Sequence, residues 1–465
     1  MVTIYGGAAP APDLPDRIVD GTSIRLPGVG RVTVLVFFNA MSDDDLSVVD
    51  GLMRLREEDR DAVDLIGVHC PRFPAEKESR RILSVLDCAG IDFPVYDDSR
   101  KNIRKAYLIN RWPSTVVVDP TGALTWAREG ILPPELVRPV LKSMGRTARV
   151  TGDLRPGAQQ RFLWSGRSFL PLRLAVEGDT LAVLDGRERR LLLAQLDPDG
   201  RSAVLKRSIP MDRPGFRSCP TGFSIDPEKI YVADRGAETV RIFDRNGREI
   251  SSYSGKPSKS NLVGPRSFGA VRDVVCRDDM LYLASPGTRQ IWVQSMSGGG
   301  ARPFAGNGGG GMDDGPPHTA TMGQPEALLS YGNLLFFSDS GSSSIRCIDP
   351  STGKITTLIG EGPSLYGCRD GIASRALLQR PLGMCLSGGS LYIADSYNDR
   401  IRALDVRTME VSTVYGDRRW QRLFSPSDVA IRDGVVYVAD LGNGRVVAFD
   451  EHRGEPEVLR ISGIS

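Results

Sequence analysis

The sequence predicts two domains, an α/β domain followed by an all-β propeller of six blades. Its 465 residues are more than one hydrophobic core usually organises. Strand-like and helix-like segments alternate over residues 1–145, which is typical of a layered α/β domain. Beyond a polar, aperiodic stretch at 146–160, a strand-rich pattern repeats six times. We therefore expect an α/β domain at 1–145, a linker at 146–160 and a propeller at 161–465.

The first domain is defined by its hydrophobic patterning. The run VTVLVFF is β-branched and aromatic throughout, as expected of a strand buried on both faces. The segment that follows it places apolar residues on one side of a helix. The expected strands are 32–38, 63–68, 115–118 and 123–126, and the expected helices are 47–60, 76–89, 99–107 and 133–143. The last two strands form a hairpin that turns at the sequence DPTG.

Two stretches, VLVFFNAMSDDDL and RWPSTVVVDPTG, resemble thioredoxin-like domains of the TlpA type. The resemblance implies that Pro113 follows a cis peptide bond. It also places Asp43 and Leu46 where such domains carry their two redox cysteines. Disulfide exchange needs a thiolate at a helix N-terminus and a second thiol to resolve the mixed disulfide. Leu46 can do neither, so the sequence excludes thiol–disulfide oxidoreductase activity at this site.

The degenerate site carries three consecutive aspartates, Asp43, Asp44 and Asp45, before Leu46 and opposite Pro113 in the resemblance. One interpretation is structural, because Ser42 or Asp43 can cap the helix and carboxylates in the first turn favour its dipole. The alternative is a small acidic site that binds a metal ion or a basic partner. We favour helix capping, and we predict no metal and no cofactor.

The second domain is defined by a repeat of two short strands around a polar turn. Its spacing of about 45–56 residues is typical of propeller blades. The six copies are LAVLDGRERRLLLAQLD, IYVADRGAETVRIFD, LYLASPGTRQIWVQS, LFFSDSGSSSIRCID, LYIADSYNDRIRALD and VYVADLGNGRVVAFD, and a further strand precedes each. In five copies the first strand ends in Asp, for which we expect a structural role in the turn.

The copy LYIADSYNDRIRALD resembles the NHL repeat, and the chain as a whole resembles NHL-repeat-containing proteins with an N-terminal thioredoxin-like domain. This resemblance implies a thioredoxin-like fold followed by a six-bladed NHL β-propeller. It covers roughly residues 20–460. The redox cysteines are absent, so a redox function does not carry over.

Charged residues recur where the innermost strand of each blade begins. The repeat register brings together Glu326, Asp428 and Asp273, which we take as candidate catalytic carboxylates. Candidate ligand-binding residues are Arg272, Arg380 and Arg173, with His318 and Tyr366 on two long glycine-rich inserts. The structural alternative is a salt-bridged lining of the central channel.

The composition excludes several classes of function. A formal net charge of +2 without a long basic stripe argues against a nucleic-acid partner. No apolar run reaches the roughly 18 residues needed to span a membrane, and the first residues do not read as a secretory signal. The seven cysteines are scattered without a CxxC pair, as in a reducing compartment. We therefore expect a cytoplasmic protein with neither nucleic-acid nor membrane partner.

Two functional hypotheses remain open. The first is a non-redox binding protein that holds a protein partner or a small ligand at the propeller mouth and the interdomain cleft. The second is a non-redox enzyme of bacterial metabolism, for example biosynthesis, with lyase, hydrolase or isomerase chemistry on the carboxylates at the mouth. Three histidines are too few for a histidine-rich zinc site, and no GxSxG elbow is present.

Overall fold

The chain folds as two compact units, Met1–Gly166 and Arg167–Ser465, which are described separately. The computed structural model describes residues 2–15, 18–21, 31–58, 63–130, 134–145, 169–212, 218–255, 268–416, 422–451 and 456–464. The predicted linker at 146–160 lies outside these residues. Within them, we find no helix with the length and apolar character needed to cross a membrane.

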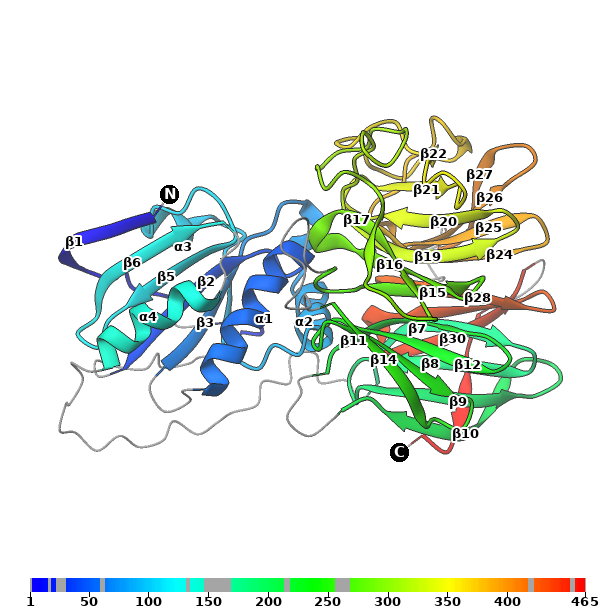
Figure 1. Ribbon diagram of the computed structural model, residues 1–465, viewed down its shortest axis with the longest axis horizontal. Coiled ribbons are helices and arrows are strands. Elements are labelled where there is room, and N and C mark those ends of the chain that lie inside the picture. The colour runs from blue at the N-terminus through cyan, green and yellow to red at the C-terminus, as the bar shows by residue number, and fades with distance from the viewer. Residues whose placement is uncertain are drawn as a thin grey trace. The chain divides into compact units, whose positions relative to one another are not determined.

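The first unit is built on one mixed sheet of six strands (Figure 1). The strands are β1 (Val2–Pro10), β2 (Val32–Phe38), β3 (Val63–His69), β4 (Val95–Asp97), β5 (Ser114–Val118) and β6 (Ala123–Glu129). Their order is β1-β6-β5-β2-β3-β4. β2 pairs in parallel with β3 and antiparallel with β5, so it lies inside the sheet with neighbours on both edges. Its continuous burial follows from this position.

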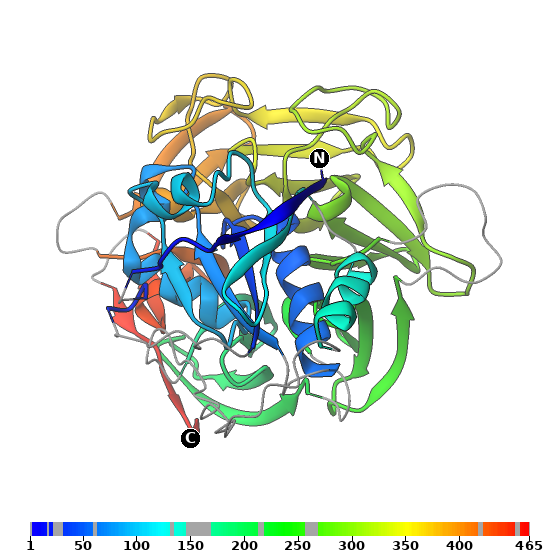
Figure 2. The same ribbon diagram turned by 90° about the vertical axis from the view of Figure 1, so that its left-hand side faces the viewer.

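Four α-helices and one 3₁₀ turn accompany the sheet. They are α1 (Asp43–Glu58), η1 (Pro74–Lys77), α2 (Ser79–Cys88), α3 (Asn102–Ala106) and α4 (Pro134–Gly145). Helices α1 and α4 contact each other and β2 (Figure 2). Val49 and Met53 of α1 are completely buried, as the apolar side of this helix predicts.

The structure adds two strands that the sequence did not predict. β1 has the sequence VTIYGGAAP, whose glycines, alanines and proline have low strand propensity, and β4 has three residues. Helix α1 begins at Asp43, four residues earlier than expected. The Trp112–Pro113 peptide bond is cis, as the resemblance implies.

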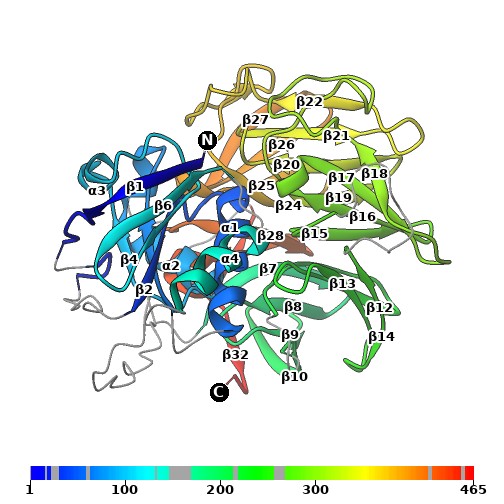
Figure 3. The same ribbon diagram turned by 60° about the vertical axis from the view of Figure 1, so that its left-hand side comes forward.

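The second unit is a β-propeller of six blades, which confirms the fold predicted from the repeat. Its innermost strands are β7 (Pro171–Glu177), β11 (Pro220–Ile225), β15 (Asp273–Arg277), β19 (Pro325–Tyr331), β24 (Pro381–Ser387) and β28 (Pro426–Arg432). Each contacts the innermost strand of the next blade, and β28 contacts β7, so the ring closes (Figure 3). The remaining strands of each blade are paired outward from these six.

The outer strands complete the blades in sequence order. Blade 1 has β8 (Thr180–Asp185), β9 (Arg190–Leu196), β10 (Ser202–Pro210) and β32 (Arg460–Ser462), and blade 2 has β12 (Lys229–Asp234), β13 (Thr239–Asp244) and β14 (Glu249–Ser254). Blade 3 has β16 (Met280–Ser285), β17 (Gln290–Ser295) and β18 (Arg302–Ala305), and blade 4 has β20 (Leu334–Asp339), β21 (Ser344–Ile348) and β22 (Ile355–Ile359). Blade 5 has β25 (Ser390–Asp395), β26 (Arg400–Asp405), β27 (Glu410–Tyr415) and β23 (Gly371–Ile372), and blade 6 has β29 (Val435–Asp440), β30 (Arg445–Asp450) and β31 (Glu457–Val458). Four 3₁₀ turns, including η2 (Pro286–Thr288), η3 (Ser396–Asn398) and η4 (Leu441–Asn443), complete the regular structure of the described residues.

Several contacts join blade 6 to blade 1, from the inner strands to the outer ones. The carboxy-terminal strand β32 pairs in parallel with β10 of blade 1. The Tyr437 hydroxyl of blade 6 donates to the Gly200 carbonyl of blade 1 at 3.0 Å. Arg432 and Asp179 form an ion pair at 2.6 Å between the same two blades. These contacts close a ring in which the other blade junctions are bridged by continuous chain.

The aspartates that end the second strand of five blades are structural, as predicted. Asp185 accepts a hydrogen bond from the Leu170 amide, Asp339 from the Gln324 amide, and Asp440 from the Phe424 amide. Asp234 and Asp395 make the same contact in their blades. In blade 3 the Ser285 hydroxyl takes this position and donates to the Phe268 carbonyl. In every blade the residue therefore ties the turn after the second strand to the segment entering the blade.

Candidate functional site

Four polar side chains gather where the innermost strands begin, and we call them the entrance cluster: Arg272, Glu326, Ser340 and Arg380. Glu326 is the second residue of β19, and Arg272 and Arg380 directly precede β15 and β24. Arg272 Nε donates to Glu326 Oε2 at 2.6 Å. Ser340 Oγ and Arg380 Nη2 both donate to Glu326 Oε1, at 3.0 and 3.4 Å. Blades 3 to 5 thus converge on one carboxylate.

The two cations of the entrance cluster are partly exposed, whereas its carboxylate is buried. The Glu326 side chain is 2% exposed, whereas those of Arg272 and Arg380 are 24% and 14% exposed. Burial alone would raise the pKa of the Glu326 carboxyl, but Arg272 and Arg380 outweigh burial and hold the pKa below its usual range. Glu326 is therefore an ionised, ion-paired group under two partly exposed cations.

Three further charged side chains lie next to the entrance cluster, and we call them the channel triad: Arg173 of β7, Asp273 of β15 and Asp428 of β28. Arg173 Nη2 lies 3.3 Å from Asp273 Oδ2, and its Nη1 lies 3.9 Å from Asp428 Oδ1. Arg173 Nη2 also donates to the Glu326 carbonyl at 3.0 Å. One guanidinium group thus faces both carboxylates and connects them to the entrance cluster.

Both carboxylates of the channel triad join one blade to the next. The Leu328 amide of blade 4 donates to Asp273 Oδ2 of blade 3 at 2.9 Å. The Leu174 amide of blade 1 donates to Asp428 Oδ2 of blade 6, also at 2.9 Å. Burial raises the pKa of Asp428 to about 7, with Arg173 partly opposing it, and burial also raises the pKa of Asp273. These groups therefore have a structural task in the ring.

The structure brings together most of the residues predicted for the mouth. Arg173, Arg272, Asp273, Glu326, Arg380 and Asp428 form the two connected layers described above. His318 and Tyr366 lie exposed on the two inserts that precede blades 4 and 5. Their ligand-binding role, and the catalytic role of the three carboxylates, remain predictions.

Two contributors to the entrance cluster escaped the sequence analysis. Ser340 follows the aspartate that ends β20, and Tyr397 lies under the Arg380 guanidinium, 5.5 Å from its carbon to the ring centroid. Both occupy turns after the second strand, which the repeat predicts but whose side chains it does not orient. Ser340 stands one residue and Tyr397 two residues after the strand-ending Asp, and this place in the repeat is the signal that could have identified them.

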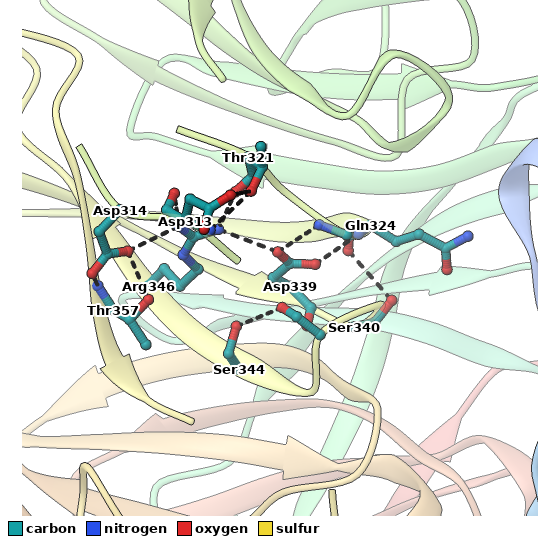
Figure 4. Close-up of polar contacts among 11 residues, drawn as sticks. Asp313, Asp314, Thr321, Gln324, Asp339, Ser340, Ser344, Arg346 and Thr357 are labelled. Atoms are coloured by element: carbon teal, nitrogen blue, oxygen red, sulfur yellow. Dashed lines mark hydrogen bonds and ion pairs between the residues drawn. The ribbon is translucent and has the colours of Figure 1, made fainter. Parts of the chain in front are cut away.

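Buried arginines in the third strands were also missed, and Figure 4 shows one of them, Arg346 of β21. Its side chain is completely buried and pairs with Asp339 at 3.5 Å and Asp314 at 2.9 Å. It also donates to the Thr321 and Asp313 carbonyls. These contacts of Arg346 hold the insert before blade 4 against that blade. Arg241 and Arg402 occupy the same repeat position in blades 2 and 5.

In the first unit, the loop before α1 is held by Asp45. Its Oδ2 accepts from the Asn39 amide at 2.6 Å and its Oδ1 from the Ser42 hydroxyl at 3.0 Å. Ser42 Oγ in turn accepts from the Asp45 amide at 3.4 Å, which is the geometry of a helix cap. Leu46 is buried, as is Pro113. Ser42, one of the two capping residues expected from the sequence, thus caps α1 with Asp45 as its reciprocal partner, while the side chains of Asp43 and Asp44 lie outside the described residues.

A buried polar network supports the same loop from below. His69 Nδ1 accepts from the Ala40 amide at 3.1 Å, and its Nε2 lies 3.0 Å from the Glu76 carbonyl. Burial lowers the pKa of His69, so the ring is neutral. Burial also raises the pKa of the neighbouring Cys70 thiol, which keeps it protonated. This network fixes a loop and offers no reactive group.

We expect Asp45→Ala to lower the free energy of unfolding of the first unit by about 2–3 kcal/mol, because the buried Asn39 amide and Ser42 hydroxyl lose their acceptor. Urea denaturation measures this loss. Asp45→Asn keeps one acceptor oxygen and is expected to lose about half as much. Unchanged stability in Asp45→Ala would mean that the carboxylate is available for another purpose.

No triplet of His, Cys, Asp or Glu side chains suited to a metal ion occurs among the residues that the structure describes. The chemistry that these clusters offer is therefore recognition by guanidinium groups and a hydroxyl. Acid–base chemistry would have to come from three carboxylates, of which Glu326 and Asp428 accept protein hydrogen bonds on both oxygens.

The fold and the repeat place the chain in a class, the six-bladed β-propellers with NHL-repeat homologues. It is 28% identical to the protein SUPPRESSOR OF QUENCHING 1, chloroplastic, from Arabidopsis thaliana, over 93% of this chain and 45% of that protein. It is 25% identical to human NHL repeat-containing protein 2, over 93% of this chain and 68% of that protein. The chain thus spans about half of the first relative's length. No family model matches it.

Solved structures give a weaker likeness. A structural genomics protein of unknown function from Bacteroides thetaiotaomicron has a TM-score of 0.46 at 18% identity, over 62% of this chain and 71% of that chain.

Proposed function

We propose that this protein is a non-redox binding protein whose propeller recognises an anionic group, a carboxylate or phosphate, through the entrance cluster. The observation that carries the proposal is the uneven exposure of the cluster. Its partly exposed side chains are the cations Arg272 and Arg380, while the Glu326 carboxylate beneath them is 2% exposed. Guanidinium groups bind carboxylate and phosphate oxygens in a preferred planar geometry.

Binding has more support than acid–base catalysis. A general base must reach the proton it abstracts and needs a pKa near the working pH. The pKa of Glu326 is held low by two arginines, so it is a poor base. Asp428 has a suitable pKa of about 7, but both of its oxygens accept backbone amides of Leu174 and Val429. As a general base in the enzyme alternative, Asp428 would have to take up a proton on an oxygen that already accepts a backbone amide.

The first unit is, on this proposal, a thioredoxin-like domain that has lost its redox chemistry and serves as a scaffold. Support comes from the cis bond before Pro113, the interior strand β2 and the buried Leu46 where a resolving cysteine would stand. The proposal retains the cytoplasmic location and the absence of nucleic-acid and membrane partners expected from the sequence. The partner is then an acidic protein segment or a small anion.

We expect Arg380→Gln to weaken anion binding about tenfold, because one charge-assisted hydrogen bond to the anion is lost while Glu326 keeps Arg272. The probes are inorganic phosphate and citrate, titrated into the full chain by calorimetry. The matched control is Arg207→Gln, which removes an exposed arginine from β10 of blade 1. Equal affinities in all three proteins, or the lack of saturable binding in the unmodified protein, would contradict the proposal.

A further inference from the structure

The channel triad is short of one positive charge. Arg173, Asp273 and Asp428 are 7%, 4% and 5% exposed, so two carboxylates share one guanidinium group almost out of contact with water. Asp273 Oδ1 accepts no hydrogen bond from any residue that the structure describes. A buried carboxylate with an unfilled acceptor oxygen is costly when it is ionised.

The other charges close to the triad belong mainly to the entrance cluster. From β19, Glu326 contributes one negative charge, which is paired with both Arg272 and Arg380, and Arg272 partly opposes the effect of burial on the pKa of Asp273. From β24, Cys385 interacts with Asp428, and burial raises the pKa of this thiol well above its usual value, so it adds no charge. The triad and the entrance cluster together carry three cations and three carboxylates, but Arg173 is the cation that forms ion pairs with both Asp273 and Asp428.

Glycines on the neighbouring blades leave the carboxylates little room to rearrange. A β-carbon at Gly222 would overlap Asp273 Oδ1, and one at Gly383 would overlap Asp428 Oδ1. The same Gly–Asp contact thus occurs in blades 2 and 3 and again in blades 5 and 6, on opposite sides of the ring. Each carboxylate oxygen packs against a glycine backbone, which leaves less space for a hydrated ion than for a hydrogen atom.

We propose that the channel triad is a proton-binding site, in which Asp273 and Asp428 together hold one proton near neutral pH and release it to solvent as the pH rises, at a cost to the stability of the ring. The proton leaves the two buried carboxyls with one negative charge for the one guanidinium group that both of them contact, and Asp273 Oδ1 is an acceptor that no described residue occupies. Because the two carboxyls face one guanidinium, the proton belongs to the pair. The ring is affected because each of these carboxyls joins two blades, and a second ionised carboxylate in this buried site is unfavourable.

The direction of the pH effect follows from the raised pKa of the carboxyl in the folded protein. Burial raises the pKa of Asp428 in the folded protein to about 7, from an ordinary 3.8. A carboxyl with a raised pKa stabilises the fold fully below its unfolded pKa, and this stabilisation is lost as the pH rises through the folded value. The fold should therefore lose stability between about pH 4 and about pH 7, and no more from this group above that range.

Infrared spectroscopy tests the proton directly. The unmodified protein at about pH 6 should show a protonated-carboxyl stretching band that Asp428→Asn reduces and that Asp433→Asn does not. Asp433 is a matched control, because it lies in the same blade, is exposed, and has the positive φ that asparagine tolerates. The proposal is overturned if neither Asp428→Asn nor Asp273→Asn reduces this band relative to the unmodified protein.

Thermal unfolding tests the consequence for the ring. The melting temperature of the unmodified protein, relative to that of Asp428→Asn at the same pH, should fall by several degrees from about pH 5 to about pH 8 and then level off. Asp433→Asn should follow the unmodified protein throughout. A constant difference between the unmodified protein and Asp428→Asn would overturn the proposal. If Asp428→Asn fails to fold, the same comparison with Asp273→Asn decides.

Discussion

Arg173→Met should lower the free energy of unfolding of the propeller by about 3–5 kcal/mol at neutral pH. The change keeps most of the side-chain volume but removes the one guanidinium group that faces Asp273 and Asp428. Both carboxylates would then lie buried without a cation, although each still accepts an amide from the next blade. Equilibrium denaturation of the full chain measures the loss.

The cost of Arg173→Met should depend on pH. At low pH the two carboxyls are protonated and the lost cation matters less, so the destabilisation should be smaller at about pH 5 than at about pH 8. Adding Asp273→Asn and Asp428→Asn to Arg173→Met removes the uncompensated charge and should restore part of the stability. Arg207→Met, on an exposed strand position, serves as the control. A loss that is equal at both pH values would show that Arg173 acts through packing alone.

The propeller could be predicted from the sequence because its signal is repeated. Six copies of a strand–turn–strand pattern define the second and third strands of every blade, and an aspartate ending the second strand marks the turn in five of them. The outermost strands lack this signal. In blade 2, for example, β14 is largely exposed, and its Ile250 is itself half exposed. The short strand β32 pairs across the ring closure, and no local pattern encodes such a partner.

The sequence predicted where the charged residues of the propeller gather, but it did not predict which of them pair. The repeat register put Glu326, Asp428 and Arg272 at the start of the innermost strands, where the structure has them. The register also places Glu326 one position before Ala327, which aligns with Asp273 and Asp428. It does not specify that the Glu326 carboxylate pairs with Arg272 and Arg380 rather than joining the channel triad. Which carboxylate receives which arginine depends on the alternation of strand faces and on turn conformations that the sequence does not specify.

The buried aspartate that ends the second strand is paired with an arginine of the third strand in one of two ways. In blades 1 and 6 the buried aspartate pairs with an arginine directly opposite on the third strand, Arg190 with Asp185 and Arg445 with Asp440. In blade 4 that opposite residue is Ser344, and the arginine stands two residues later, at Arg346. The later position also reaches the insert, which explains why an arginine is buried there.

Arg346→Met should therefore have two effects, a loss of about 3–5 kcal/mol in the free energy of unfolding and a release of the insert before blade 4. The first effect arises because Asp339, which is completely buried, loses its cation. The second arises because Asp314 and the carbonyls of Asp313 and Thr321 lose the group that holds them. Denaturation measures the first, and hydrogen exchange of the amides between residues 311 and 324 measures the second.

The matched controls separate charge from packing. Arg346→Lys keeps the cation but not the several parallel donors, so it should preserve part of the stability while the insert still exchanges faster. Arg302→Met removes an exposed arginine from β18 of blade 3 and should change neither quantity. Faster exchange in Arg346→Met with unchanged stability would contradict the first effect, because the fold would then not need this cation beside Asp339. Unchanged exchange would mean that other contacts hold the insert against the blade, such as the hydrogen bonds from the Thr357 amide and hydroxyl of β22 to Asp314.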